Sequence, residues 1–217
     1  MTMIDLGPQT PASYPVQFDV DYPDRPLNRL TTFFRLILII PIVIVLSLVS
    51  GQGPTIPMGS TRVVFITAGG FLFLPVLLLI LFRRKYPRWW FDWNLELLRF
   101  GNRVGTYIAL LRDECPSTDE QQAVHLDIRY PEAERELNRW LPLVKWLLAI
   151  PHYIVLFLLS IVTLFVVIIS WFAILFTGRY PPTLFDFVVG FLRWQNRVTA
   201  YAILLATDTY PPFRLGP

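Results

Sequence analysis

Two kinds of hydrophobic pattern follow one another along this chain. In residues 16–20 and again in 124–128, apolar and polar residues alternate with a period of two, which predicts a short β-strand with one apolar face. Each of these segments leads into a long apolar tract. The 20 residues 63–82 and the 32 residues 146–177 carry no charge. Uncharged apolar runs of about 18 residues or more are typical of membrane-spanning helices, so the pattern predicts an integral membrane protein.

Each apolar tract is expected to cross the membrane twice. In the first tract, the segments 33–49 and 63–82 are separated by SGQGPTIPMGST, whose glycines and prolines predict a loop. The second tract, 140–177, has no such loop. A single straight helix of that length would measure roughly 57 Å, nearly twice the hydrocarbon thickness. Two antiparallel spans with a tight turn near Ser160 are therefore predicted, with a hairpin dipping into one leaflet as the alternative.

The two halves of the chain resemble one another. VQFDVDYP from Val16 matches VHLDIRYP from Val124, and YPRWWFDWNLELLRFGNRVGTYIALL from Tyr86 matches YPPTLFDFVVGFLRWQNRVTAYAILL from Tyr180. This predicts a tandem repeat in which each copy consists of a strand, a transmembrane hairpin and an amphipathic helix. The expected divisions are a flexible N-terminal tail (1–15), a first repeat (16–116), a linker (117–123) and a second repeat (124–213).

The predicted fold class is thus an all-α membrane protein, a tandem repeat of two-helix transmembrane hairpins with four spans in total. Interfacial amphipathic helices and short cytoplasmic β-strands complete it. Basic residues lie at both ends of both tracts, and the loop within the first tract holds only Arg62. The positive-inside rule then places both termini, and both ends of each hairpin, in the cytoplasm.

Composition narrows the range of partners. Hydrophobic residues make up 54% of the chain and charged residues 16%, and 17 of the 19 basic residues are arginine. The planar guanidinium group suits phosphate and carboxylate groups. These arginines are dispersed along the tract ends and form no single patch, which argues against nucleic acid. The expected partners are membrane lipids, anionic ones among them, and either a second copy of the chain or another membrane protein.

The amphipathic segments contain the candidate binding residues. On a helical wheel of residues 91–111, the charged residues share one face and the aromatic and aliphatic residues take the other, as expected for a helix in the membrane interface. The residues expected to grip lipid phosphates or acidic groups of a partner are Arg99, Asn102, Arg103, Arg193, Asn196 and Arg197. The alternative is that these arginines form structural ion pairs, with Asp92 and Asp186 as the expected partners.

No catalytic, cofactor-binding or metal-binding residues are predicted. With two histidines and one cysteine, Cys115, a Cys/His metal cluster is out of reach, and no nucleophile–base arrangement is apparent. His152 is the one ionisable residue well inside a tract, and its counterpart in the first half is Ile42. We expect it to be a structural, neutral imidazole.

The residues of the second half resemble those of a known family. FTGRYPPTLFDFVVGFLRWQNRVTAYAILLATDTYPPF, preceded by WLLAIPHYIVLFLLS, is similar to the bacterial DUF4389 family of membrane proteins, here in two tandem copies. The first half departs from it by having DECPST where the second half has the closing TYPPF. The resemblance implies a bacterial inner membrane protein and, because the function of the family is unknown, no site residues.

Taken together, the sequence predicts a non-enzymatic, multi-pass membrane protein. It would act at the cytoplasmic face as a scaffold, or as a module that binds a partner or lipid. The alternative function is a small channel or transporter that forms its path by oligomerising.

Overall fold

Two short strands that lie far apart in the sequence pair into one antiparallel sheet. The computed structural model describes residues 14–42, 44, 46, 73–118, 120, 122–133 and 135–216. Strand β1 (Val16–Val20) pairs with β2 (Val124–Ile128), with Phe18 opposite Leu126 at the centre. Because side chains alternate between the two faces of a strand, the apolar residues face inward and the polar residues form the outer surface.

Six helices lie in the described residues. They are α1 (Arg29–Leu38), α4 (Phe73–Arg83), α5 (Arg88–Ile108), α6 (Leu141–Leu148), α7 (Ile150–Thr177) and α8 (Pro182–Ala202). Local chemistry explains several of their ends. The side chain of Asn28 accepts hydrogen bonds from the first backbone N–H groups of α1, while Pro87 and Pro181 in extended conformation precede α5 and α8. Gly178, with a φ of 74°, ends α7 in the left-handed conformation that favours glycine.

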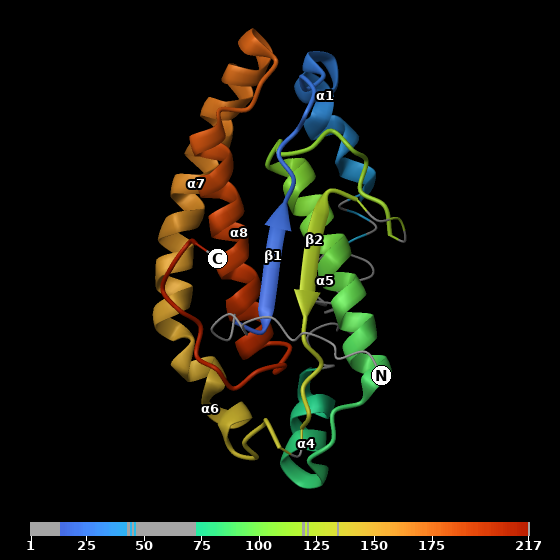
Figure 1. The fold of residues 1–217 in the computed structure, drawn as a ribbon, viewed down its shortest axis with the longest axis vertical. Coiled ribbons are helices and arrows are strands. Elements are labelled where there is room, and N and C mark those ends of the chain that lie inside the picture. The colour runs from blue at the N-terminus through green and yellow to red at the C-terminus, as the bar shows by residue number, and fades with distance from the viewer. Residues whose placement is uncertain are drawn as a thin grey trace, which may run out of the picture.

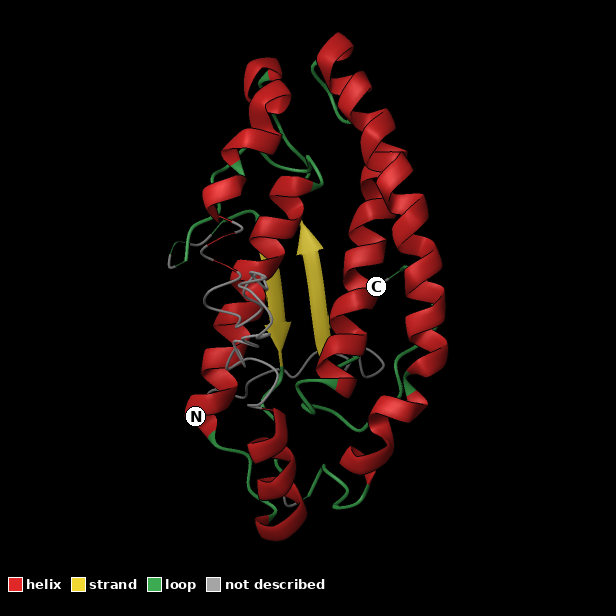
Figure 2. Ribbon diagram, turned by 180° about the vertical axis from the view of Figure 1, so that it is seen from behind, coloured by secondary structure: helices red, strands yellow, loops and turns green. Residues whose placement is uncertain are grey.

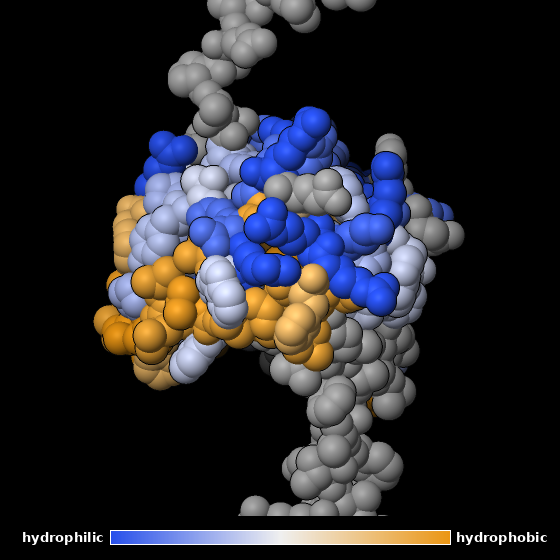
Figure 3. All heavy atoms as spheres, turned by 90° about the horizontal axis from the view of Figure 1, so that it is seen from below, coloured by the Kyte–Doolittle hydropathy of each residue, from blue (hydrophilic) through white to orange (hydrophobic). Residues whose placement is uncertain are grey.

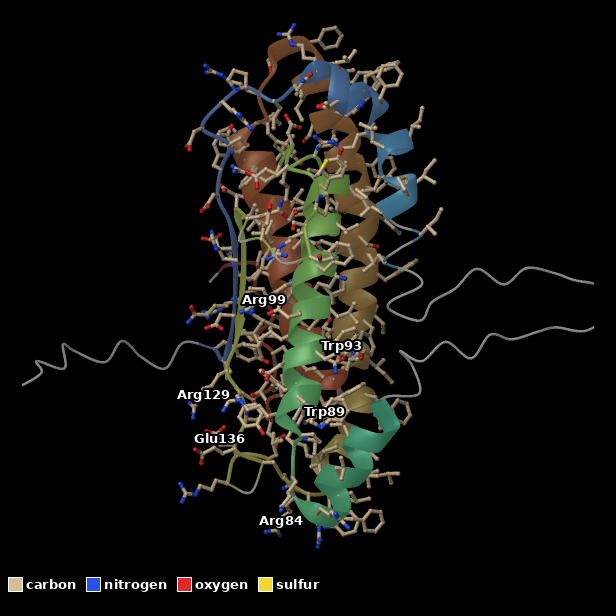
Figure 4. The ribbon with its side chains drawn as sticks, turned by 90° about the vertical axis from the view of Figure 1, so that its right-hand side faces the viewer. Arg84, Trp89, Trp93, Arg99, Arg129 and Glu136 are labelled. Atoms are coloured by element: carbon tan, nitrogen blue, oxygen red, sulfur yellow. The ribbon has the colours of Figure 1, made fainter. Side chains whose placement is uncertain are left out.

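These elements form three layers. The sheet is the outermost layer, α5 and α8 form the middle layer, and α1, α4, α6 and α7 lie behind them (Figures 1 and 4). All the long elements run roughly along the longest axis of the molecule, as the view from behind also shows (Figure 2). Each strand packs on the helix of the other half of the chain, because β1 contacts α8 and β2 contacts α5. The two halves are therefore intertwined.

The main hydrophobic core lies between the sheet and the middle layer. Phe18 is 3% exposed and Leu126 is 4% exposed, and both pack with buried residues of α5 and α8 such as Phe91 and Val188. Ile174, near the end of α7, extends this core into the third layer. The layers are consequently held by apolar contacts that continue from the sheet to α7.

The prediction of a four-span repeat of transmembrane hairpins is wrong. The described residues contain one helical segment, Leu141–Thr177, that is long and apolar enough to cross a membrane. It does not reverse near Ser160, because α7 runs without interruption from Ile150 to Thr177. The hydroxyl of Ser160 donates to the carbonyl of Phe157 within the same helix. No proline or glycine lies between Ile150 and Thr177 apart from Pro151 in the first turn, so α7 continues as one helix.

The first tract also differs from its prediction. The predicted spans 33–49 and 63–82 fall partly outside the described residues, and what is described of them is divided between α1, the residues that follow it, and the eleven-residue α4. Neither described helix has the roughly 20 residues that a span requires. A multi-pass arrangement with both termini on one side therefore has no support in this fold.

The amphipathic helices occupy a different place from the one predicted. They do not lie as an outer interfacial layer; α5 and α8 form the middle layer, with the sheet on one side of them and α7 behind α8. Amphipathicity identifies two unlike faces of a helix, and each face can be covered by protein as well as by water or lipid. Here the sheet covers part of the charged face.

Candidate functional site

The two asparagines of the predicted site meet at the centre of the molecule. The Nδ2 group of Asn102 donates to Oδ1 of Asn196 (2.8 Å), and the Nδ2 group of Asn196 donates to Oδ1 of Asn102 (2.7 Å). The asparagines are 9% and 5% exposed, and each also donates to a carbonyl one turn earlier in its own helix. This reciprocal pair joins α5 to α8. Buried polar groups are stable only when they are hydrogen-bonded, and here each amide provides the partner of the other.

Two of the predicted arginines hold the free edges of the sheet. Arg99 donates from Nε to the carbonyl of Leu126 (3.0 Å), and Arg193 donates from Nε to the carbonyl of Phe18 (2.9 Å). The backbone N–H of Asp21 donates to the carbonyl of Ala123, and hydrogen-bonded pairs recur at every second residue of an antiparallel sheet. Phe18 and Leu126 therefore form a non-hydrogen-bonded pair, and their backbone N–H and C=O groups point outward, away from the partner strand. The arginines thus satisfy edge carbonyls that could otherwise pair with another chain.

The other two arginines, Arg103 and Arg197, bind carbonyls of loops. Arg103 donates to the carbonyl of Ser117 (2.7 Å), and Arg197 donates to those of Arg214 (3.3 Å) and Gly216 (2.7 Å). They are 8% and 2% exposed. Burial lowers the pKa of the Arg197 guanidinium, and the nearby positive charge of Arg214 acts in the same direction. A guanidinium group remains protonated even so, and carbonyl oxygens compensate its charge here.

The expected ion-pair partners lie elsewhere. Asp92 and Asp186 are exposed. The ion pairs in which Arg99 and Arg193 take part within the described residues are made with Glu96 (2.6 Å) and Asp19 (3.1 Å). The structure therefore joins the two predicted asparagines to each other and directs the four predicted arginines to backbone carbonyls of the strands and loops. Whether any of them contacts lipid or a partner stays a prediction.

Two buried ion pairs were not predicted from the sequence. Lys145, fully buried, lies 2.7 Å from Oδ1 of Asp208 and donates to the carbonyl of Thr207. Arg35, 2% exposed, pairs in the same way with Asp113. The aspartates also accept the backbone N–H groups of Asn138 and Asn28, respectively. One signal was present in the sequence, since an aspartate follows the Leu-Leu pair that ends each amphipathic segment within two or three residues.

Residues 207–216, which we name the C-terminal segment, pack against both α7 and α8. His152 is fully buried beneath this segment and stacks on Phe213, with ring centroids 3.9 Å apart. Nδ1 of His152 accepts a hydrogen bond from Nε1 of Trp194 (3.1 Å), which places the proton of a neutral imidazole on Nε2. The ring therefore serves as packing surface and acceptor. Arg193 also donates to the carbonyl of Leu215 in this segment (3.1 Å).

Gly190 allows the C-terminal segment to approach α8, which gives a testable prediction. A Cβ at this position would lie 2.9 Å from Cβ of Leu215 and 3.0 Å from its carbonyl oxygen. We expect Gly190→Ala to lower the free energy of unfolding by about 1 kcal/mol, measured by denaturant titration in detergent. Gly105→Ala in α5 is the matched control, because nothing lies within 4 Å of its added Cβ and alanine is the better helix former. Equal effects of the two substitutions would contradict the close approach.

A second candidate site is an exposed apolar surface on α6 and α7, which we name the apolar face. Within Leu141–Thr177, only 11% of the most apolar stretch of 18 residues is buried. The large hydrophobic residues exposed along the two helices are Leu143, Val144, Trp146, Leu147, Leu148, Ile150, Tyr153, Ile154, Phe157, Leu158, Ile161, Val162, Leu164, Phe165, Ile168, Ile169, Phe172 and Phe176. Viewed along the long axis, hydrophobic residues gather on one side of the molecule and hydrophilic residues on the opposite side (Figure 3).

Exposed aromatic residues also lie on α5. Trp89 and Trp93 are 72% and 53% exposed, and both point toward the side of α4 and α7 (Figure 4). Arg99, on the same helix, points the other way, toward the strands (Figure 4). Trp140, directly before α6, and Trp146, within α6, are 66% and 56% exposed. Four tryptophans with more than half of their surface exposed are typical of a membrane boundary.

Comparison with known proteins identifies one family. The family model described as a domain of unknown function, DUF4389, matches residues 140–214. No curated protein and no solved structure matches the chain. The predicted resemblance to this family is confirmed for these residues, which comprise α6, α7, α8 and most of the C-terminal segment. One copy is matched, so the tandem duplication is not confirmed by this comparison.

Proposed function

Starting from a chain whose residues 140–214 are a DUF4389 domain, we propose that the protein is a non-enzymatic scaffold bound to the surface of a membrane. Its apolar face rests in one leaflet, and the outer surface of its sheet faces water. The observation that carries this proposal is the exposure of α7, the most apolar helix among the described residues, on the side of the molecule opposite the sheet (Figure 4). The core helix of a soluble protein would be mostly buried, and a patch of this size marks an interaction surface.

The length of the apolar face favours a helix that lies along the membrane. Exposed apolar residues continue from Leu143 to Phe176. At 1.5 Å per residue this amounts to about 50 Å, against a hydrocarbon core of about 30 Å. A helix crossing along the membrane normal would leave a large part of that surface in water. A helix lying in the leaflet buries all of it.

The layered arrangement favours the same orientation. The strands and α8 run roughly parallel to α7 (Figures 1 and 2). If α7 crossed the bilayer, β1 and β2 would be carried into the hydrocarbon, with open edges and the exposed carboxylates of Asp19 and Asp127. Open sheet edges do not occur in contact with lipid, because their backbone groups have no water to bind. With α7 in the leaflet, the layer formed by α5 and α8 separates the sheet from the membrane-bound helix.

The apolar character of α7 on all sides fits this position. One side of the helix packs against α8 and α1, and the remaining sides are exposed. Protein interior and acyl chains both favour apolar residues. The tryptophans at the edges of the face would lie at headgroup depth. We place the face on the cytoplasmic leaflet of the bacterial inner membrane, whose anionic lipids attract the exposed arginines described below.

The paired contacts of the two halves support an internal duplication, which we propose as part of this architecture. Arg99 and Arg193 occupy matching positions of the sequence and make matching bonds to strand carbonyls. Lys145 and Arg35 also match, and each pairs with an aspartate that follows an amphipathic helix. In this view the second half contributes the long apolar helix, and the first half completes the sheet and the middle layer.

Binding to neutral vesicles tests the proposal. Phe157 on the apolar face is 66% exposed. We expect Phe157→Glu to weaken binding to phosphatidylcholine vesicles about tenfold, because the apolar contact of the ring with acyl chains is lost. The measurement is flotation of purified protein with vesicles. Gln17→Glu on the outer face of β1 adds the same charge and should leave binding unchanged. A wild-type protein that does not float with vesicles, or equal losses in both variants, would overturn the proposal.

A further inference from the structure

We infer that the end of α7 carries a binding site for the phosphate group of an anionic phospholipid, formed by Arg25, Arg29 and Arg179. This inference rests on the proposed membrane binding and names the lipid class and the residues that select it. A cleft of about 660 Å³ opens at this end of the molecule, between the segment that precedes α1 and the turn that joins α7 to α8. Arg25 and Arg179 both line it.

The chain fixes the shape of this cleft. The backbone N–H of Leu27 donates to the carbonyl of Gly178 (2.8 Å), and the hydroxyl of Tyr22 donates to the carbonyl of Tyr180. These bonds hold the two walls together. Prolines on both sides, Pro23 and Pro181 among them, restrict the backbone of the walls. The site is therefore a built cavity between two tied segments.

The arginines of this cleft are available for a ligand. Arg25, Arg29 and Arg179 are exposed, and their guanidinium groups make no hydrogen bond or ion pair with any part of the chain that the structure describes. Arg29 lies over Gly178, since its Nε would be 3.6 Å from a Cβ at that glycine. Arg25, Arg179 and Asp24 line the cleft, and Arg29 lies next to it at Gly178, so this end of α7 carries three guanidinium groups and one carboxylate. The net charge of these groups is positive, which suits a negatively charged phosphodiester.

The residue that matches Arg29 in the second half makes the contrast clear. Arg139 donates from Nε to the carbonyl of Leu81 (2.5 Å) and from a terminal nitrogen to that of Phe82 (3.3 Å), so it caps the end of α4. The end of α7 is closed instead by Gly178, whose N–H donates to the carbonyl of Ile174 (2.7 Å). Arg29 is consequently not needed as a cap, and its fork remains open to an anion.

The cleft also adjoins hydrocarbon-facing residues. Ala173 and Thr177 of α7 line it, and Phe176 beside them is 78% exposed. On α1, Leu30 and Phe33 are 68% and 56% exposed, and Phe33 stacks on Trp171 of α7. A phospholipid whose acyl chains lie against these residues would bring its phosphate to the arginines. Guanidinium groups bind phosphate oxygens through two parallel hydrogen bonds, which makes a lipid phosphate the fitting ligand.

The test compares vesicles of phosphatidylcholine alone with vesicles of phosphatidylcholine and phosphatidylglycerol. The triple variant Arg25→Gln, Arg29→Gln, Arg179→Gln is compared with the control Arg83→Gln, Arg84→Gln, Lys85→Gln, which removes the same charge at the other end of the molecule (Figure 4). We expect the first variant to lose about tenfold more of the affinity for the anionic vesicles than the control does, the ratio that about 1.4 kcal/mol produces. Binding to phosphatidylcholine alone should remain in both.

A charge-conserving variant separates a site from general attraction. Arg25→Lys, Arg29→Lys, Arg179→Lys keeps the charge and removes the planar fork, so a phosphate site predicts a loss and diffuse attraction predicts none. Added inorganic phosphate, as the soluble source of the same group, should not release the protein, because it lacks the acyl chains. Equal losses in the glutamine variant and its control, an unchanged lysine variant, or release by free phosphate would overturn the inference. If the wild-type protein binds neither kind of vesicle, the proposed membrane binding fails as well.

Discussion

Replacing Lys145 by methionine is expected to lower the free energy of unfolding by about 3–5 kcal/mol. Lys145 has no exposed surface, and its ammonium group lies between Asp208 and the carbonyl of Thr207. Methionine fills a similar volume but leaves the aspartate, which is 19% exposed, without its counter-charge. A largely buried carboxylate without a counter-charge destabilises the fold by much more than the intact ion pair stabilises it.

Denaturant titration in detergent measures this effect, and two further variants identify its cause. Lys85→Met removes an exposed lysine and should change the free energy of unfolding by no more than a few tenths of a kcal/mol. Asp208→Asn in the Lys145→Met background removes the orphaned charge while retaining an oxygen for the N–H of Asn138. It should therefore restore part of the stability. If the double variant is less stable than Lys145→Met alone, the loss does not come from the unpaired charge.

Asn102→Leu is expected to lower the free energy of unfolding by about 2 kcal/mol, because it leaves the buried amide of Asn196 without its hydrogen-bond partner on α5. Oδ1 of Asn196 would lose the donor at 2.8 Å, and its Nδ2 would retain only the carbonyl of Leu192. Both side chains lie between α5 and α8 and are less than 10% exposed, so water cannot readily replace the lost partner. Asn196→Leu should cost a similar amount for the same reason.

The double substitution tests whether the two asparagines act as a pair. Replacing both by leucine removes both halves of the reciprocal contact and leaves no orphaned amide, so the loss should be smaller than the sum of the single losses. A coupling free energy of about 1 kcal/mol or more is the expected result of the cycle. Strict additivity of the two single effects would mean that each asparagine is satisfied independently, contrary to the geometry of the pair.

Several elements follow from local patterns. Alternation with a period of two located β1 and β2, because a strand with one covered face requires it. The segments opened by Tyr-Pro predicted α5 and α8, whose beginnings the structure places directly after Pro87 and Pro181. The tract 140–177 was recognised as helical and apolar. For each of these elements, the deciding information lies within about 20 neighbouring residues.

The path of the second tract and the role of the arginines did not follow from such patterns. The prediction of a turn near Ser160 assumed that the tract must fit across a bilayer, and α7 instead remains one helix that packs along α8. The arginines of α5 and α8 were assigned to lipid or to Asp92 and Asp186. The fold gave Arg99 and Arg193 the carbonyls of strands from the opposite half of the chain, which no helical wheel contains.

The sequence by itself determined where β1, β2, α5 and α8 form and that the second tract is helical and apolar, since backbone preference and hydropathy act over short distances. The tertiary structure alone decided what covers each face. β1 and β2 are separated by more than 100 residues, and their pairing sets which helix each strand packs on and which carbonyls remain for the arginines. It also placed the polar strands opposite the apolar face, which is the arrangement on which the proposed membrane orientation rests. Contacts between distant segments are favourable only once the chain has closed large loops, and no local pattern encodes which of them form.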